Sequence, residues 1–415
     1  MIISQATVRH ISQRIQQDGW ASAGRQATRK VARLLLDKWA LAEPELPLRP
    51  GDIVDSAQEI RGYNADPATG PLSIGWVCAP PGPGSGGHTT LFRMVRAMET
   101  RGHHCTLFLY DRNSDDPSRH EETIRRYWPA LNADVRSATR GLDGVDAIVA
   151  SSWASAHVIA ARAPRSVHPF YFIQDYEPYF YPRGALYALA EDSYRFGFTN
   201  IALGAMIAEV MRFELGQAPE AVVPYGCDTT TYHLIRGDKQ TPRSGVVYYA
   251  KKTVDRRGYL LAKMALELFH EKCPEQEIHV YGDVVTGWQV PVINHGNLPP
   301  KQLNSLYNQT IAGLAISFTN ISLVPGELLA SGNVPVLNQA PFASGLLTDP
   351  DAVWAPSTPG GLAAALTAVV RAPNINLRAA TIANRKRLDW DASGEAFADV
   401  LHSTCAGARR GVRQP

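Results

Sequence analysis

Two carboxylates and an amide follow one short apolar run, at Gln174, Asp175 and Glu177. The run over residues 170–173 reads FYFI, which is typical of a buried strand. Paired acids directly after such a strand favour a binding or catalytic site, because carboxylates can accept hydrogen bonds from hydroxyl groups or take part in proton transfer. Asp175 and Glu177 are therefore candidate catalytic residues.

Aromatic side chains surround these polar residues in the sequence. A Tyr or Trp ring has an apolar face and a polar tip, which suits stacking on a sugar ring and equally suits packing at a domain boundary. Both interpretations stay open at this point. The candidate rings for binding an acceptor sugar are Tyr176 and Tyr179 in this stretch and Trp153 earlier in the chain.

A glycine-rich loop, APPGPGSGGHTT over residues 79–90, follows an earlier apolar run. Gly86 and Gly87 precede a predicted helix, where free backbone N–H groups can bind an anion or a polar ligand. The loop is not G-x-G-x-x-G and no acidic ribose-binding residue follows at the usual distance, which weighs against a nicotinamide cofactor. His88 is a candidate catalytic residue, although a lone histidine such as His88 or His157 is more commonly structural.

Four cations lie within seven residues at Lys251, Lys252, Arg256 and Arg257. The lysines come just after a predicted strand and the arginines just before a predicted helix. Such a cluster at the ligand-binding end of a sheet can bind a diphosphate. The alternative is a solvated basic loop, which is common on protein surfaces.

Glu327 follows Pro325 and Gly326 at a predicted helix start. An acid there can simply complement the helix dipole, or it can accept hydrogen bonds from a ribose diol. Asp349 and Asp351 match a D-x-D metal signature only in letters, since they lie in a proline-containing loop away from the nucleotide-binding turns. No metal site is expected.

Short apolar runs separated by helical patterns extend along most of the 415 residues. This alternation predicts an α/β fold with βαβ units and parallel sheets buried on both faces. The pattern ends near residue 226 and begins again near residue 245, which predicts two Rossmann-like domains that face each other across a cleft. The expected boundaries are 1–70 for a helical extension and linker, 71–226 and 227–390 for the two domains, and 391–415 for a terminal helix and tail.

Composition excludes several classes of protein. The net charge of +2 gives no reason to expect nucleic-acid binding, and the five scattered cysteines favour a reducing compartment. No run approaches the length of a membrane span, so a cytoplasmic protein is expected. Residues 1–40 are basic and amphipathic, and they are expected either to pack on the main body or to contact the inner face of an anionic membrane.

Three stretches of the second half carry a resemblance to a known family. They are VPYGCDTTTYHL (223–234), VYYAKKTVDRRGYLLA (247–262) and HGNLPPKQLNSLYNQTIAGLAIS (295–317). In this order they resemble the hinge, the diphosphate-binding segment and the stretch before the E-x7-E element of family-4 glycosyltransferases, which have the GT-B fold. The resemblance implies a nucleotide-sugar donor in the second domain and transfer without a metal or other cofactor. The implied donor-binding residues are Gly86, Gly87, Lys251, Arg256, Arg257, Gly282, Leu298, Asn320, Ser322, Leu323 and Glu327.

Some positions depart from that family. The second Glu of E-x7-E is Glu327, but the first falls on Thr319, and Gln174 stands where many members carry His before Asp. The letters Q-D-Y-E-P-x-F-Y from residue 174, with G-G-H in the first loop, resemble bacterial rhamnosyltransferases that assemble surface rhamnan and S-layer glycans. This narrower resemblance implies transfer of L-rhamnose from dTDP-L-rhamnose onto a glycan or lipid-linked acceptor, as in O-antigen biosynthesis.

Two alternatives stay open from the sequence. A nucleotide-sugar epimerase of the same fold would need no acceptor. A non-catalytic subunit of glycan assembly would explain why Thr319 and Gln174 replace residues of a catalytic type.

Overall fold

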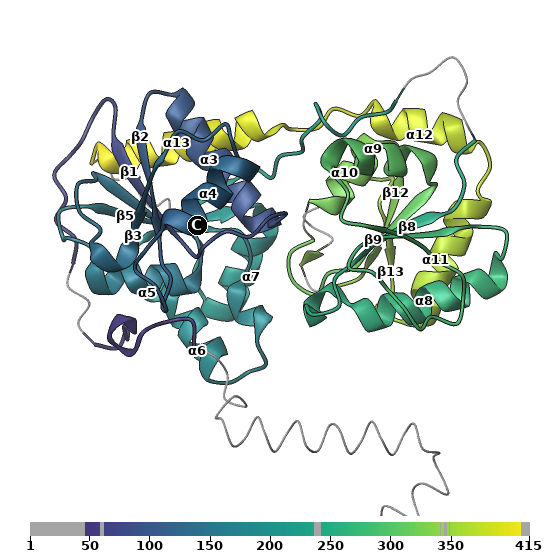
Figure 1. Cartoon of the computed structure of the whole chain (residues 1–415), viewed down its shortest axis with the longest axis horizontal. Helices are drawn as coiled ribbons and strands as arrows, with labels where there is room; N and C mark the ends of the chain where they lie inside the picture. Colours follow the sequence, from purple (N-terminus) through teal and green to yellow (C-terminus); the bar gives the residue numbers. More distant parts are fainter. Residues whose placement is uncertain are drawn as a thin grey trace, which may run out of the picture. The chain divides into compact units, whose positions relative to one another are not determined.

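A computed structural model describes residues 46–58, 62–235, 242–321, 323–340, 342–343, 347 and 349–407. The first domain contains a seven-stranded sheet in which every neighbouring pair is parallel (Figure 1). The strand order is β3-β2-β1-β4-β5-β6-β7. The strands are β1 Ser73–Cys78, β2 His104–Leu109, β3 Asp134–Ser137, β4 Ala147–Ala150, β5 His168–Ile173, β6 Thr199–Leu203 and β7 Ala221–Val223.

The second domain contains a six-stranded sheet, again entirely parallel, in the order β10-β9-β8-β11-β12-β13. Its central strands are buried, and their apolar side chains form one core with the helices beside them. The strands are β8 Val246–Ala250, β9 Ile278–Gly282, β10 Ile293–Gly296, β11 Ala312–Ala315, β12 Val334–Asn338 and β13 Val353–Ala355. The prediction of two parallel α/β sheets is confirmed.

Both sheets reverse their strand order beside their first strand, between β1 and β4 and between β8 and β11. In open parallel sheets the loops at such a switch point, at the carboxyl ends of the strands, are where ligands bind. The loops concerned follow β1 and β4 in the first domain and β8 and β11 in the second. The glycine-rich loop and the basic loop recognised in the sequence are two of these four.

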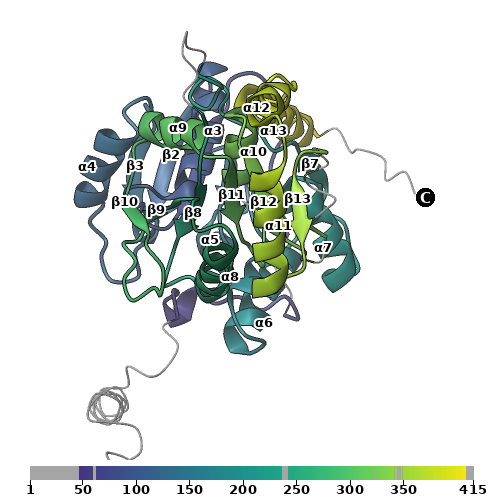
Figure 2. The ribbon, with the colours of Figure 1, turned by 90° about the vertical axis from the view of Figure 1, so that its right-hand side faces the viewer.

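Helices connect successive strands and cover the sheets. Figure 2 shows α8 and α11 side by side over the second sheet, where they pack against each other. Those of the first domain are α3 Gly86–Thr100, α4 Ser118–Tyr127, α5 Trp153–Arg162, α6 Ala185–Asp192 and α7 Ala205–Leu215. Those that follow are α8 Tyr259–Lys272, α9 Pro300–Gln309, α10 Val324–Ala330, α11 Pro359–Arg371, α12 Ile375–Ala383 and α13 Trp390–Cys405.

The terminal helix α13 packs on the first domain, although the chain reaches it from the second (Figure 1). Asp389 caps its start by accepting a hydrogen bond from the backbone of Ala392. Phe397 stacks on Trp76 of β1 with ring centroids 5.4 Å apart. The helix therefore supplies part of the first domain's core, which its position in the sequence does not indicate.

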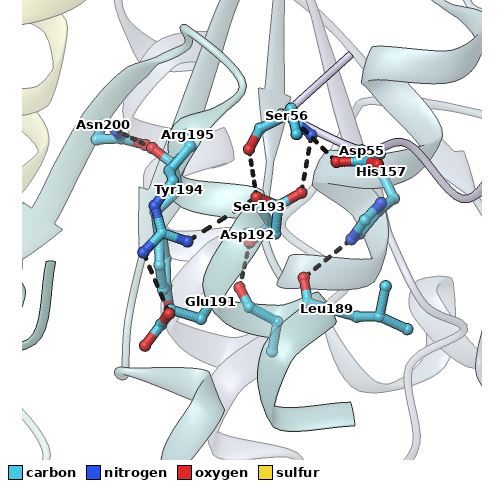
Figure 3. Close-up of polar contacts among 12 residues, drawn as sticks. Asp55, Ser56, His157, Leu189, Glu191, Asp192, Ser193, Tyr194, Arg195 and Asn200 are labelled. Carbon is cyan, nitrogen blue, oxygen red and sulfur yellow. Dashed lines mark hydrogen bonds and ion pairs between the residues drawn. The ribbon is translucent and has the colours of Figure 1, made fainter. Parts of the chain in front are cut away.

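The chain just before the first domain is fixed to it by polar contacts. Asp52 is buried and binds both Arg162 and the hydroxyl of Tyr110. Figure 3 shows Ser56 facing Asp192, to which its backbone and hydroxyl both donate. These contacts attach residues 52–56 to α5 and α6.

His157 belongs to the same set of contacts. Its side chain is fully buried and accepts a hydrogen bond from the backbone N–H of Val54. It also donates to the carbonyl of Leu189, as Figure 3 shows. His157 is therefore structural. The predicted helical extension over residues 1–40 lies outside the described residues. None of the helices that the structure does describe is both long enough and apolar enough to cross a membrane.

Candidate functional site

The segment after β5 meets the loop after β11 at Asp175. Its carboxylate accepts hydrogen bonds from the hydroxyl of Thr319, at 2.8 Å, and from the backbone N–H of Asn320, at 3.2 Å. The Asn320 side chain in turn donates to the carbonyl of Gln174 at 2.8 Å. Thr319 and Asn320 are 1% and 4% exposed. We call these three hydrogen bonds the interdomain contact.

Arg257 supports that contact from the loop after β8. Its guanidinium donates to the hydroxyl of Ser317 and to the carbonyl of Asn320, at 3.0 and 3.2 Å. The two switch-point loops of the second sheet are thereby joined beneath Asp175. Burial raises the pKa of Asp175, and the positive charge of Arg257 acts in the opposite direction.

Glu177 lies within the first domain and accepts a hydrogen bond from the backbone N–H of Trp153, the first residue of α5. An acid at a helix N-terminus satisfies a backbone N–H that has no partner within the helix. Tyr194 fixes the same segment, because its hydroxyl accepts from the backbone N–H of Glu177 and donates to the carbonyl of Asp175. Glu177 thus anchors the strand-end loop, and its burial raises its pKa to about 8.

The candidate acceptor-binding rings are largely enclosed by protein. Tyr176 and Trp153 are 2% and 3% exposed. Tyr176 stacks on Tyr194, and Trp153 donates from its indole N–H to the hydroxyl of Tyr181. These two rings are packed within the first domain and do not present an open face to an acceptor. Tyr179 is half-buried, with its hydroxyl bonded to Glu214 at 2.7 Å.

His88 holds the glycine-rich loop to the start of α3. Its Nε2 donates to the carbonyl of Ala79 at 2.9 Å, so its Nδ1 is the acceptor for the Ser85 hydroxyl at 2.8 Å. Both ring nitrogens are occupied, which gives His88 a structural role in this arrangement. Gly86 and Gly87 are exposed, and a side chain on Gly87 would reach to within 4.0 Å of the Gln174 amide oxygen.

The basic loop after β8 divides into two parts. Lys251 forms an ion pair with Asp283, and Lys252 donates from its ammonium to the carbonyl of Val284. These lysines therefore face the loop after β9.

At Gly282, which ends β9, φ is +90° and a Cβ would lie 2.5 Å from the carbonyl oxygen of Ala250, so only glycine fits this approach of two strand ends. Gly282 shapes the loop rather than offering a side chain.

The two arginines make different contacts. Arg257 binds the loop after β11 within the second domain, as described above, whereas the Arg256 guanidinium lies 3.9 Å from the centre of the Phe180 ring in the first domain. Gly258 follows them in the left-handed region, at φ +62°, with Ile316 so close that a Cβ would lie 2.5 Å from it. The turn that follows the two arginines therefore requires glycine.

Glu327 lies in the first turn of α10 and is half-buried. Its carboxylate makes no hydrogen bond or ion pair with any residue that the structure describes. Burial raises its pKa to about 7, while the charge of Arg93, which forms an ion pair with Asp228, acts to lower it. A carboxylate that has no partner among the described residues is available to accept hydrogen bonds from a ligand.

Two of the remaining donor-site candidates, Leu298 and Leu323, are among the described residues. Leu298 packs against the small core that contains Tyr281 and Tyr307. Leu323 immediately precedes α10, and Ser322 lies outside the described residues. Sequence reasoning did not select Phe180 or Arg93, since a ring among other rings and a cation within an amphipathic helix give no distinct signal.

Other polar groups are accounted for away from this site. Asp351 forms an ion pair with Arg385, and Asp349 forms one with Arg387. A cavity of about 310 Å³ opens at the amino-terminal ends of β5 and β6 beside Pro169 and Thr199. It is therefore distant from the carboxyl ends that carry the candidate residues, and we do not assign the site to it.

Comparison with known proteins gives related sequences and folds. The model of the WsaF N-terminal domain matches residues 142–205, which include Gln174 to Glu177. The O-antigen biosynthesis protein RfbC from Myxococcus xanthus is 30% identical over 332 residues. That alignment covers 76% of this chain and 26% of RfbC, so the matched part spans about a quarter of the relative's length.

Solved structures superpose on most of this chain at low sequence identity. HepE from Anabaena, in complex with UDP and glucose, superposes with a TM-score of 0.60 at 16% identity and covers 80% of this chain and all of its own. TarM from S. aureus superposes with a TM-score of 0.61 at 6% identity and covers the same shares. These superpositions, together with the two parallel sheets, show that the chain has the fold of GT-B glycosyltransferases.

Proposed function

We propose that this protein is a glycosyltransferase that transfers L-rhamnose from dTDP-L-rhamnose to a growing bacterial surface glycan. The observation that carries the proposal is the meeting of Asp175 with the switch-point loops of the second sheet, where Arg256 and Arg257 supply positive charge. A carboxylate beside clustered cations, at the ligand-binding ends of two parallel sheets, suits transfer of a sugar away from a diphosphate.

The comparisons support parts of this proposal. RfbC is named for O-antigen biosynthesis, and the HepE and TarM structures contain UDP. The choice of rhamnose rests on the narrower sequence resemblance at Gln174 to Glu177, which falls inside the segment matched by the WsaF domain model. The family-4 resemblance further favours retention of the anomeric configuration.

Each group has a role in the proposed reaction. Glu327 accepts hydrogen bonds from the ribose hydroxyls, which do not react. Arg256 and Arg257 stabilise the negative charge that develops on the leaving diphosphate. Asp175 contacts a hydroxyl of the transferred sugar or of the acceptor, once the hydrogen bonds from Thr319 and Asn320 are exchanged for ligand contacts.

A transfer assay tests this function. The protein is incubated with dTDP-L-rhamnose, UDP-glucose or UDP-N-acetylglucosamine, with and without a rhamnose-terminated oligosaccharide. Release of dTDP only when the acceptor is present is expected. An isomerised sugar formed without acceptor would indicate an epimerase, and neither product with any donor would favour a non-catalytic subunit.

The proposed reaction uses no metal ion, since the arginines provide the positive charge at the diphosphate. Activity is therefore expected to survive excess EDTA. Near-complete loss that Mg²⁺ or Mn²⁺ restores would contradict this part of the proposal.

The membrane contact of residues 1–40 stays a prediction. If these residues bind anionic lipid, deleting them should abolish sedimentation with anionic vesicles and leave transfer to a water-soluble acceptor intact. Unchanged sedimentation would indicate that this segment does not supply the contact.

A further inference from the structure

The four cations of the basic loop are not equivalent in their contacts. Lys251 pairs with Asp283, Lys252 donates to a carbonyl, and Arg257 donates to Ser317 and to the carbonyl of Asn320. Arg256, by contrast, makes no side-chain hydrogen bond and no ion pair with any described residue, and its Nε is buried without a partner. A guanidinium has five N–H donors, so this group has the largest unused capacity to bind an anion in the loop.

A half-buried guanidinium without a carboxylate partner needs another source of stabilisation. Here it is the ring of Phe180, whose centre lies 3.9 Å from the Arg256 Cζ. An aromatic face attracts a cation, and stacking on a ring occupies only the flat face of the guanidinium. The N–H groups of its two Nη atoms, which have no partner among the described residues, stay available to a ligand.

The two residues come from different domains. Phe180 belongs to the 3-10 turn Glu177–Phe180 after β5, which Glu177 anchors to α5, whereas Arg256 precedes α8 in the second domain. The ring is thus held by the first domain's framework and can fix the direction of a side chain that the second domain supplies.

We propose that Phe180 is a positioning residue that holds the Arg256 guanidinium with its N–H edge directed at the diphosphate of the nucleotide sugar. This inference rests on the proposed function, and it adds a residue of the first domain to the recognition of the diphosphate. Phe180 itself does not contact the reacting atoms.

Calorimetric titration with dTDP tests this role without requiring turnover. Phe180→Leu keeps an apolar side chain but removes the ring, and it is expected to weaken dTDP binding by about 3- to 30-fold. Phe180→Tyr keeps the ring and should bind like wild type. Phe213→Leu, the same change at a 71% exposed position of the first domain, is the matched control and should also bind like wild type.

A double-mutant cycle with Arg256→Gln separates positioning from a general structural effect. If Phe180 acts through Arg256, the double variant should bind dTDP no more weakly than Arg256→Gln alone. Thymidine, which has no diphosphate, should bind wild type and Phe180→Leu equally. Thermal unfolding of each variant checks that the fold is retained.

The inference is overturned if Phe180→Leu binds dTDP like wild type, if the two losses add, or if thymidine binding falls by the same factor. Failure of the proposed function is a separate result. In that case the wild type and the variants would bind dTDP as expected above, but the wild type would transfer no sugar to any acceptor.

Discussion

Asp175 and Glu327 are both acids near the carboxyl ends of parallel strands, but their surroundings differ. Asp175 receives hydrogen bonds from Thr319 and Asn320 of the opposite domain, whereas Glu327 has no partner among the described residues. Burial raises the pKa of both carboxyl groups. The protein itself supplies hydrogen bonds to Asp175, whereas the described residues supply none to the Glu327 carboxylate.

This difference suggests how the two acids serve a ligand. An open carboxylate can bind a group that needs no rearrangement, such as a ribose that arrives with the donor. The Asp175 carboxylate can bind substrate only when its hydrogen bonds from Thr319 and Asn320 are exchanged for ligand contacts. We therefore expect its interactions to matter most during sugar transfer. We therefore expect substitution of Asp175 to lower kcat and substitution of Glu327 to weaken nucleotide binding.

The largest expected effect is on turnover at Asp175. Asp175→Asn keeps the shape but removes the negative charge, and interactions that strengthen in the transition state should be lost. We expect kcat to fall by about 10²-fold or more. Steady-state kinetics of transfer measure this, and a variant with full kcat would remove Asp175 from the chemistry.

The next effect is the pH dependence of nucleotide binding. Because the pKa of Glu327 is raised to about 7, the carboxyl is mostly protonated at pH 6 and mostly ionised at pH 8. If the ionised form binds the ribose, dTDP affinity should rise by about tenfold over this range. Glu327→Gln should lose the dependence. A titration series in which the variant keeps the same pH profile would point to another group.

Thr319→Val sharpens the comparison from the opposite side of the interdomain contact. The substitution removes one hydrogen bond to Asp175 and is expected to change kcat by about 2- to 12-fold, corresponding to about 0.5–1.5 kcal/mol. Thr381→Val, at an exposed position of α12, is the control. Equal kcat values for both variants and wild type would mean that the Thr319 hydroxyl does not influence Asp175 during turnover.

The smallest expected effect is on stability at Glu177. Burial raises its pKa from the ordinary 4.5 to about 8, so the folded state holds its proton more tightly than the unfolded state does. The contribution of the Glu177 carboxyl group to the free energy of unfolding is fully present below about pH 4.5, and it is lost as the pH rises through about 8. The fall in Tm between pH 6 and pH 8.5 should therefore be smaller in Glu177→Gln by a few degrees. If Tm falls equally in the variant and in wild type, groups other than Glu177 cause the pH dependence.

Much of the fold could be predicted because the central strands are buried on both faces and read as continuous apolar runs. The apolar run over residues 170–173, for example, predicts a buried strand and lies within β5. The strands β3, β10 and β13 are not predicted from such runs. Each is an edge strand of three or four residues with partly exposed side chains, so the signals of burial and of length are both weak.

The candidate site was predictable only in outline. The position of Asp175 after a strand follows from the sequence, but its contact with Thr319 joins residues 144 apart and depends on how two domains meet. Tyr176 and Trp153 illustrate another limit. A ring with a polar tip suits both sugar stacking and packing, and burial in the folded chain decides the matter for these two.

The proposed roles of the two acids are tested most directly by calorimetric titration of dTDP into Glu327→Ala, Asp175→Asn and wild type. Glu327→Ala should bind about 10- to 100-fold more weakly, the loss expected for a charged hydrogen bond of about 1.5–3 kcal/mol. Asp175→Asn should bind nearly as well as wild type. The opposite pattern, with weak binding in Asp175→Asn and wild-type binding in Glu327→Ala, would place the nucleotide in the first domain and contradict the account.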